Sequence, residues 1–190
     1  MTVAPNDPIL VKYREKHGIL AGIAFQRDME RKAAIMGGGD FTVPVQRLTD
    51  FIENRPSENA PSSSYRLGVK PSACHELFPA KMTKSLQDAV VNHFEKQMPG
   101  FLCDEALLHG VEMRTSSPVR ITRDPETLQS IGKFGLFPAG EGAGFAGGIV
   151  SAAVDGLSVG AAILEVLTIE ENNDGKEGKT KKQKSVGFDY

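Results

Sequence analysis

Apolar positions in the first half of the chain recur mainly every three or four residues, which is the spacing of one helix face. This pattern predicts an amphipathic helix over Gly22–Met36. The glycines Gly37–Gly39 should end it, because glycine enters the left-handed region freely. Similar spacing predicts a helix over about Pro44–Asn54, with the proline in its first turn, and another over about Thr83–Met98. The apolar run Ile9–Val11 indicates a short strand.

The second half of the chain has a different pattern. Val119 and Ile121 alternate with polar residues, which indicates a strand, and the apolar run Gly135–Ala139 is typical of a buried strand. From Gly147 to about Leu167 the residues are small and apolar, which predicts a closely packed buried helix.

Composition and charge narrow the class of protein. The 190 residues carry a formal net charge of -2, and this balance argues against a general nucleic-acid-binding protein, which is usually markedly basic. The 40% share of hydrophobic residues is sufficient for a packed core. Residues 169–190 turn to Asn, Gly, Lys and Glu, which predicts a disordered, charged tail.

Residues that commonly carry chemistry are sparse. Cys74 and Cys103 lie in no Cys-x-x-Cys motif, and neither they nor the histidines have the spacing of a zinc site, so no metal is expected. The apolar stretch Ala143–Leu167 is interrupted by Asp155 and Glu165, which favours a buried helix over a membrane span. Asp155 either pairs with an arginine in the interior or lies where the helix meets solvent.

Glycine is concentrated near the end of the chain, where nine of the 20 glycines lie between Gly132 and Gly160. Within that region Gly142–Gly147 matches the pattern Gly-x-Gly-x-x-Gly, between an expected strand and an expected helix. Such glycines let the backbone approach a phosphate or a flavin carbonyl edge, and the helix start supplies unpaired N–H groups. A Rossmann motif also needs a second strand and an acidic residue, which do not follow here. The residues alone leave a ligand-facing turn and a merely close-packed turn equally open.

A second candidate segment is Arg-Thr-Ser-Ser-Pro-Val-Arg over residues 114–120. Its two arginines bracket hydroxyl residues, and the guanidinium group suits carboxylate and phosphate oxygens, as in a cofactor or substrate pocket. The alternative is a polar surface loop with an ion pair, which composition alone favours.

Two longer runs carry a family resemblance. They are Glu-Met-Arg-Thr-Ser-Ser-Pro-Val-Arg-Ile at residues 112–121 and Gly-Leu-Phe-Pro-Ala-Gly-Glu-Gly-Ala-Gly-Phe-Ala-Gly-Gly-Ile at residues 135–149. With residues 22–30 and 44–51, they resemble the C-terminal part of FAD-dependent dehydrogenases, flavoproteins of the two-dinucleotide-binding-domain type. The similarity spans about residues 9–167.

The resemblance implies an α/β fold of mixed α+β character, the C-terminal portion of a Rossmann-like FAD/NAD(P)-binding flavoprotein. Residues 1–110 would form an inserted helical segment on the substrate side. Residues 111–168 would form the C-terminal part of the FAD-binding domain, followed by the tail at 169–190.

The resemblance also implies a split FAD site, to which this chain contributes a late glycine–acidic turn and the helix after it. Glu141 would accept a hydrogen bond from a ribityl or ribose hydroxyl, and N–H groups at Gly147, Gly148 and Ile149 would face the flavin N1/C2=O edge. The resemblance favours the pocket interpretation of the arginine segment as well. The implied cofactor-binding residues are Gly140, Glu141, Gly142, Ala143, Gly144, Gly147, Gly148 and Ile149, and the implied pocket residues are Arg114, Thr115, Ser116 and Arg120.

The resulting hypothesis is the C-terminal portion of an FAD-dependent oxidoreductase acting on a small molecule. An N-terminal ADP-binding half, for which this sequence has no glycine-rich motif, would be its intramolecular partner. No nucleic-acid or membrane partner is expected, and the cytoplasm or the plastid stroma would suit such a protein. The alternative is a non-enzymatic interaction module or remnant that does not bind FAD alone.

Overall fold

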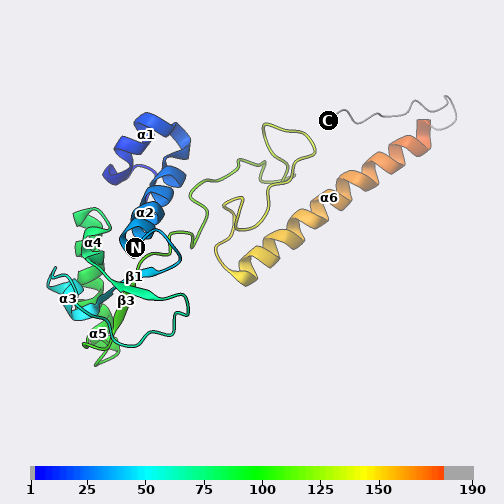
Figure 1. Ribbon diagram of the computed structural model, residues 1–190. Helices are drawn as coiled ribbons and strands as arrows, with labels where there is room; N and C mark the ends of the chain where they lie inside the picture. Colours follow the sequence, from blue (N-terminus) through cyan, green and yellow to red (C-terminus); the bar gives the residue numbers. More distant parts are fainter. Residues whose placement is uncertain (1–2, 178–190) are drawn as a thin grey trace. The chain divides into compact units, whose positions relative to one another are not determined.

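The computed structural model describes residues 3–177 and divides the chain into two compact units, Met1–Pro118 and Val119–Tyr190. The division falls a few residues after the 110/111 boundary expected from the sequence. The first unit contains the β-sheet and all the described helices except α6, which belongs to the second unit (Figure 1).

The first unit begins with helices rather than with the strand expected at Ile9–Val11. A 3₁₀ turn over Pro8–Leu10 leads into α1, Val11–His17, and a second 3₁₀ turn, Gly18–Leu20, leads into α2. The strand prediction is wrong because Asp7 caps this start: its carboxylate accepts the Ile9 N–H at 2.9 Å, and Pro8 takes the first position, where no N–H is needed.

Helix α2, Ala21–Gly37, confirms the helix predicted over Gly22–Met36. Its end is also confirmed, since Gly38 has φ of 124° and Gly39 has φ of 87°. The buried face of α2 joins a core of residues from the start of the chain and from α4: Leu10, Tyr13, Ala21, Phe25, Met29 and Met82.

A three-stranded sheet follows, in the order β2-β1-β3. The central strand β1, Val43–Arg47, pairs in parallel with β2, Val69–Pro71, and antiparallel with β3, Leu107–His109. The prediction of a helix over Pro44–Asn54 is therefore wrong for its first part, which is strand β1. The strand uses the Pro44 carbonyl, which accepts the Gly110 N–H at 2.9 Å, and only α3, Leu48–Ile52, is helical.

The expected helix over Thr83–Met98 is present but begins earlier. It consists of α4, Ala80–Ala89, a π-helical stretch, Val90–Phe94, and α5, Glu95–Gln97. Thr83 lies inside α4 rather than capping it. Its hydroxyl donates to the carbonyl of His75, in the 3₁₀ turn Cys74–Glu76, at 3.0 Å. These elements complete the mixed α/β architecture that the sequence predicts.

The second unit contains a long irregular segment before its helix. Residues 119–148 form no helix or strand beyond an isolated bridge between Arg123 and Ser130, so both strands expected here are wrong. The backbone groups of this segment bond across loops instead: Ile121 N–H donates to the Ala143 carbonyl at 3.1 Å. Within the run 135–139, the Leu136 carbonyl likewise accepts from the Ser130 N–H of a neighbouring loop, at 2.7 Å.

Helix α6, Ile149–Glu177, is longer and more exposed than the sequence predicts. It continues through residues 169–177, which were expected in the disordered tail, while residues 178–190 of that tail lie outside the described residues. Val159 is buried, but Ile149 and Leu157 are 93% and 75% exposed, so the expectation of a buried helix is wrong for this chain. By length and composition alone, Ile149–Ile169 is apolar enough to cross a membrane.

Candidate functional site

The glycine-rich turn, residues 140–148, is a compact loop that leads directly into α6. Inside it, the Gly144 N–H donates to the Glu141 carbonyl at 2.9 Å and the Phe145 N–H donates to the Gly140 carbonyl at 3.0 Å. Gly140 and Gly144 have φ of 68° and 83°, a region that other residues rarely adopt. These two glycines therefore give the turn its shape.

Gly144 is also required by close packing. A Cβ atom there would lie 2.5 Å from the Val119 carbonyl oxygen and 3.0 Å from the Cα atom of Arg120. Because both are backbone atoms, they cannot move aside as a side chain can. At this position the close-packed interpretation of the glycine pattern is sufficient.

The remaining glycines of the turn have no such reason within the described residues. A Cβ atom at Gly142 or Gly147 would meet nothing within 4 Å, and one at Gly148 would only touch the Ser151 hydroxyl at 3.6 Å. None of the three has a positive φ. Gly147 and Gly148 are exposed and directly precede α6, so their lack of a side chain allows the close approach that a ligand at a helix start needs.

The start of α6 is arranged by Ser151. Its hydroxyl accepts the Gly148 N–H at 3.2 Å and donates to the Gly148 carbonyl at 3.0 Å, while the Ala152 N–H also donates to that carbonyl, at 2.9 Å. Ile149 is exposed, as is Glu141 on the other side of the turn. The Gly148 N–H is therefore bonded within the chain, while Glu141 and Ile149 are exposed at the two ends of one loop.

An ion pair between Arg123 and Asp155 holds the turn against α6. Guanidinium nitrogens of Arg123 lie 2.5 and 3.1 Å from the two Asp155 oxygens, and the side chains are only 9% and 14% exposed. Asp155 also accepts the Gly140 N–H at 2.8 Å, and Arg123 also donates to the Pro138 carbonyl at 2.7 Å. The Arg123 hydrogen bonds, followed by that from Gly140, lower the pKa of Asp155. Of the two environments foreseen for Asp155, the interior arginine pair is confirmed.

The Phe145 ring packs against the guanidinium group of Arg123, beside its ion pair with Asp155. The Arg123 guanidinium carbon lies 3.6 Å from the centre of the Phe145 ring, and that of Arg120 lies 5.0 Å from it. Arg120 also donates from Nε to the Gly144 carbonyl at 2.9 Å. The structure thus brings Arg120, one of the four pocket residues implied by the resemblance, to the glycine-rich turn.

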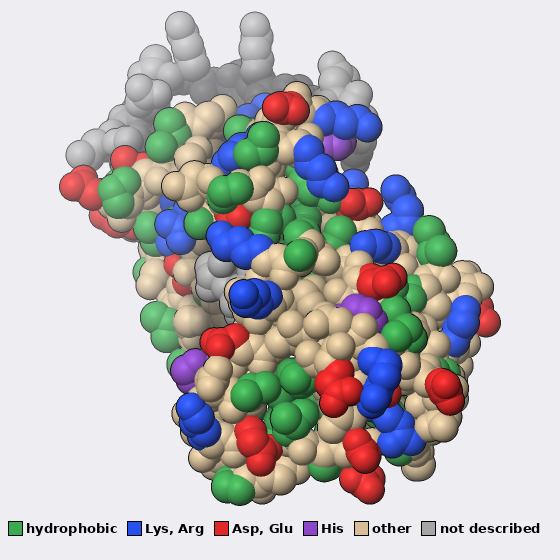
Figure 2. All heavy atoms as spheres, turned by 90° about the vertical axis from the view of Figure 1, so that its left-hand side faces the viewer, with side chains coloured by type: hydrophobic (Ala, Val, Ile, Leu, Met, Phe, Trp, Pro, Cys, Tyr) green, Lys and Arg blue, Asp and Glu red, His purple; other side chains and the backbone are tan. Residues whose placement is uncertain are grey.

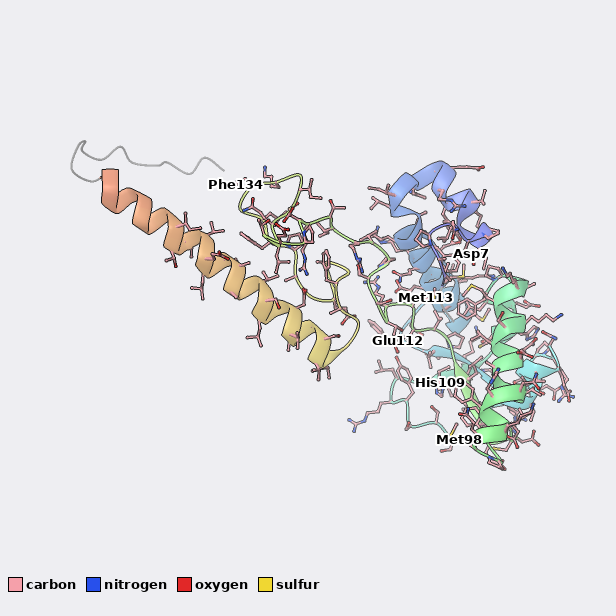
Figure 3. All side chains as sticks on the ribbon, turned by 180° about the vertical axis from the view of Figure 1, so that it is seen from behind. Asp7, Met98, His109, Glu112, Met113 and Phe134 are labelled. Atoms are coloured by element: carbon pink, nitrogen blue, oxygen red, sulfur yellow. The ribbon has the colours of Figure 1, made fainter. Side chains whose placement is uncertain are left out.

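The other three implied pocket residues belong to the first unit. There Arg114 forms two hydrogen bonds to the Glu30 carboxylate, at 2.7 and 2.8 Å, and these bonds lower the pKa of Glu30. The neighbouring Thr115 and Ser116 are exposed. Next to them, the Met113 carbonyl accepts from Gln26 of α2 at 2.8 Å, in the chain segment after His109 that Figure 3 labels. The surface-ion-pair alternative therefore describes Arg114.

Candidate metal ligands do not gather at any site among the described residues. No three His, Cys, Asp or Glu side chains there are placed to hold a metal ion. Cys74 is buried, and desolvation raises the pKa of its thiol to about 11, which keeps it protonated and unreactive at neutral pH. On the face shown in Figure 2, Lys and Arg side chains are interspersed with Asp and Glu, so neither sign dominates that face.

A hollow of about 500 Å³ lies between α1, α2 and the segment Leu77–Pro79. Its polar groups bond to one another: Tyr13 donates to Asp28, and Lys32 donates to the carbonyls of Glu76 and Leu77 at 2.7 and 3.1 Å. Burial raises the pKa of Tyr13, so its hydroxyl stays protonated. None of the site residues implied by the resemblance lines this hollow.

Comparison with known proteins gives two findings. The family model described as "FAD-dependent protein, C-terminal domain-like" matches residues 2–115, which is most of the first unit. An uncharacterized protein of Clostridium beijerinckii is 43% identical over 167 residues, covering 87% of this chain. The chain spans only 30% of the length of that relative. The family match covers more than half of the residues and confirms the resemblance found in the sequence, and so the chain belongs to the FAD-dependent protein, C-terminal domain-like family.

Proposed function

We propose that this chain is the C-terminal portion of an FAD-dependent oxidoreductase, in which the glycine-rich turn and the first turn of α6 lie against the flavin. The observation that carries the proposal is the exposed backbone at Gly147 and Gly148, where neither φ nor the surrounding atoms require glycine. Membership of an FAD-dependent family supplies a ligand that such a surface fits.

The donors and acceptors present match the polar groups of FAD. The start of α6 is the positive end of the helix dipole, which suits the electron-rich carbonyl edge of a flavin, where negative charge develops on reduction. The Glu141 carboxylate, exposed on the same loop, can accept from a ribityl or ribose hydroxyl. Bound FAD would supply the redox chemistry, and the chain would orient the ring and stabilise its charge.

Arg123 and Asp155 act in this proposal as positioning residues. Their pair ties Gly140 to α6 and so sets the path of the backbone that leads to Gly147 and Gly148. Arg120 lies on the same loop and adds positive charge beside it. The FAD-binding half implied by the resemblance would supply the contacts to the ADP part of the cofactor and would be the intramolecular partner.

The proposal is tested in a chimera, in which this chain replaces the matching segment of the Clostridium relative. We expect the purified chimera to be yellow, with flavin absorption, and Gly148→Leu or Glu141→Arg to remove the colour. Gly132→Leu is the matched control for the glycine variant, since a Cβ atom at Gly132 also meets nothing within 4 Å and its φ is not positive. A folded but colourless chimera, or a Gly148→Leu variant that keeps its flavin, would contradict the proposal.

A further inference from the structure

Helix α6 has one side that packs against its own unit and one that does not. The packed side contains Asp155 and the buried Val159, turned to the irregular segment 119–148. Val150, Val154, Leu157, Ala161 and Leu164 recur at helical spacing on the other side. In Figure 3, side chains along one side of α6 point toward the preceding segment and those along the other side point away.

The side that points away is both apolar and exposed. Val150, Val154, Leu157 and Leu164 are 76%, 57%, 75% and 65% exposed. A continuous apolar stripe of this kind is uncommon on the surface of a soluble protein and marks an interaction site. We call these four residues the outer stripe of α6.

The packed side of the helix argues for a protein rather than a membrane as the partner. Asp155 lies within Ile149–Ile169, and its carboxylate is bonded to Arg123 and to Gly140 from outside the helix. A helix crossing a bilayer would carry this ion pair and the polar loop behind it into the hydrocarbon region, at a high free-energy cost. A helix with one side covered by its own protein instead needs a cover for the other side alone.

The greater length of the Clostridium relative provides a candidate for the protein surface that covers this side of α6. Since the chain spans 30% of the Clostridium relative, 70% of that protein lies outside the matched part. We infer that the outer stripe of α6 docks against an apolar surface of this additional part of the family protein, which under the proposed function holds the rest of the FAD site. The inference rests on the proposed function and adds to it the surface that brings the glycine-rich turn to the cofactor, because that turn leads directly into α6.

The test measures the accessibility of single thiols introduced by Leu157→Cys on the outer stripe and by Ile131→Cys as a control. Ile131 is 72% exposed and lies in the irregular segment of the same unit. Each thiol is labelled with an alkylating reagent in the 190-residue chain and in the chimera with the Clostridium relative, and followed by peptide mass spectrometry. We expect labelling at position 157 to be about tenfold or more slower in the chimera, and labelling at 131 to be unchanged.

Each other outcome has a defined meaning. Equal labelling at position 157 in both proteins overturns the docking inference. So does slow labelling in the 190-residue chain alone, which would place a second copy or another part of the chain on the stripe. Protection that appears in that chain only with phosphatidylcholine–phosphatidylglycerol vesicles would assign the stripe to a membrane instead.

The flavin absorption of the same chimera distinguishes the docking inference from the proposed function. A colourless chimera with a protected thiol at 157 keeps the docking surface and overturns the cofactor assignment. A yellow chimera with an unprotected thiol at 157 keeps the cofactor assignment and overturns the docking inference. A third variant, Leu164→Cys, lies on the same stripe and should be protected together with position 157.

Discussion

Each of the two units of this chain is stabilised internally by a different kind of interaction. The first has a sheet, a buried Phe51 at 1% exposure and a second cluster around α2, so its stability comes from apolar packing. In its described part, the second unit has a single helix and a loop that is shaped by glycines and joined to the helix by Arg123 and Asp155. The difference shows that polar contacts can define a loop well even though the adjoining helix leaves apolar side chains exposed.

The largest expected effect lies in the core of the first unit. Phe51→Ala removes a buried ring that packs with Leu48 and Val90, and should lower the free energy of unfolding by about 3–5 kcal/mol. Phe41→Ala, at an 81% exposed position, should change it little. Urea unfolding followed by circular dichroism checks both, and equal effects would mean that the apolar packing described for this unit is wrong.

A smaller effect is expected in the glycine-rich turn. Gly144→Ala should destabilise the second unit by about 1–3 kcal/mol, because φ is positive and the new methyl group would meet the Val119 carbonyl. Gly147→Ala makes the same chemical change in open space and should have little effect. Hydrogen exchange of residues 119–148 measures the difference. Similar exchange in the two variants would contradict the division of the glycines into close-packed and open positions.

The ion pair predicts that acid destabilises the glycine-rich turn of the second unit. Because the pKa of Asp155 is lowered in the folded chain, its stabilisation is complete above the unfolded value of about 3.9 and is lost as pH falls through the lower folded value. Asp155→Asn should remove this dependence and speed exchange of the Gly140 amide by about tenfold at neutral pH. Glu126→Gln, at an exposed position in the same segment, is the control. An unchanged exchange rate of the Gly140 amide in Asp155→Asn would show that the Asp155 carboxylate does not hold the turn.

The smallest effect is expected from the exposed arginine pair of the first unit. Arg114→Gln removes two hydrogen bonds to Glu30, yet the Arg114 side chain is 70% exposed, so the urea midpoint should not move measurably. Arg123→Gln makes the same change at 9% exposure and should disturb the second unit clearly. Should Arg114→Gln prove the more disruptive of the two, the ranking by burial fails.

Local patterns predicted the parts of the fold that local interactions determine. Helix α2 has a long apolar repeat and a glycine terminator, both readable in the sequence. Strand β1 has five residues, and its identity depends on pairing with β2 and β3, which lie far away in the chain, so Pro44 was assigned to a helix. The exposure of α6 was also missed, because an apolar composition does not reveal what covers the helix.

The candidate site could be predicted in part for the same reason. The glycine pattern located the turn, and the family resemblance indicated a flavin as its ligand. The sequence also raised an arginine partner for Asp155, but it could not single out Arg123, which lies 32 positions away. Nor could it separate Gly144, fixed by the Val119 carbonyl, from Gly147, because both are glycines of the same motif and they differ in their surroundings in space.

The central claim is that the turn and the start of α6 face the flavin. It is tested most directly by hydrogen exchange of the chimera with and without FAD. The account predicts slower exchange with FAD at the amides of Gly147, Gly148 and Ile149, and no change at Gly132. Bound flavin, seen by its absorption, without slower exchange at these three amides would contradict it.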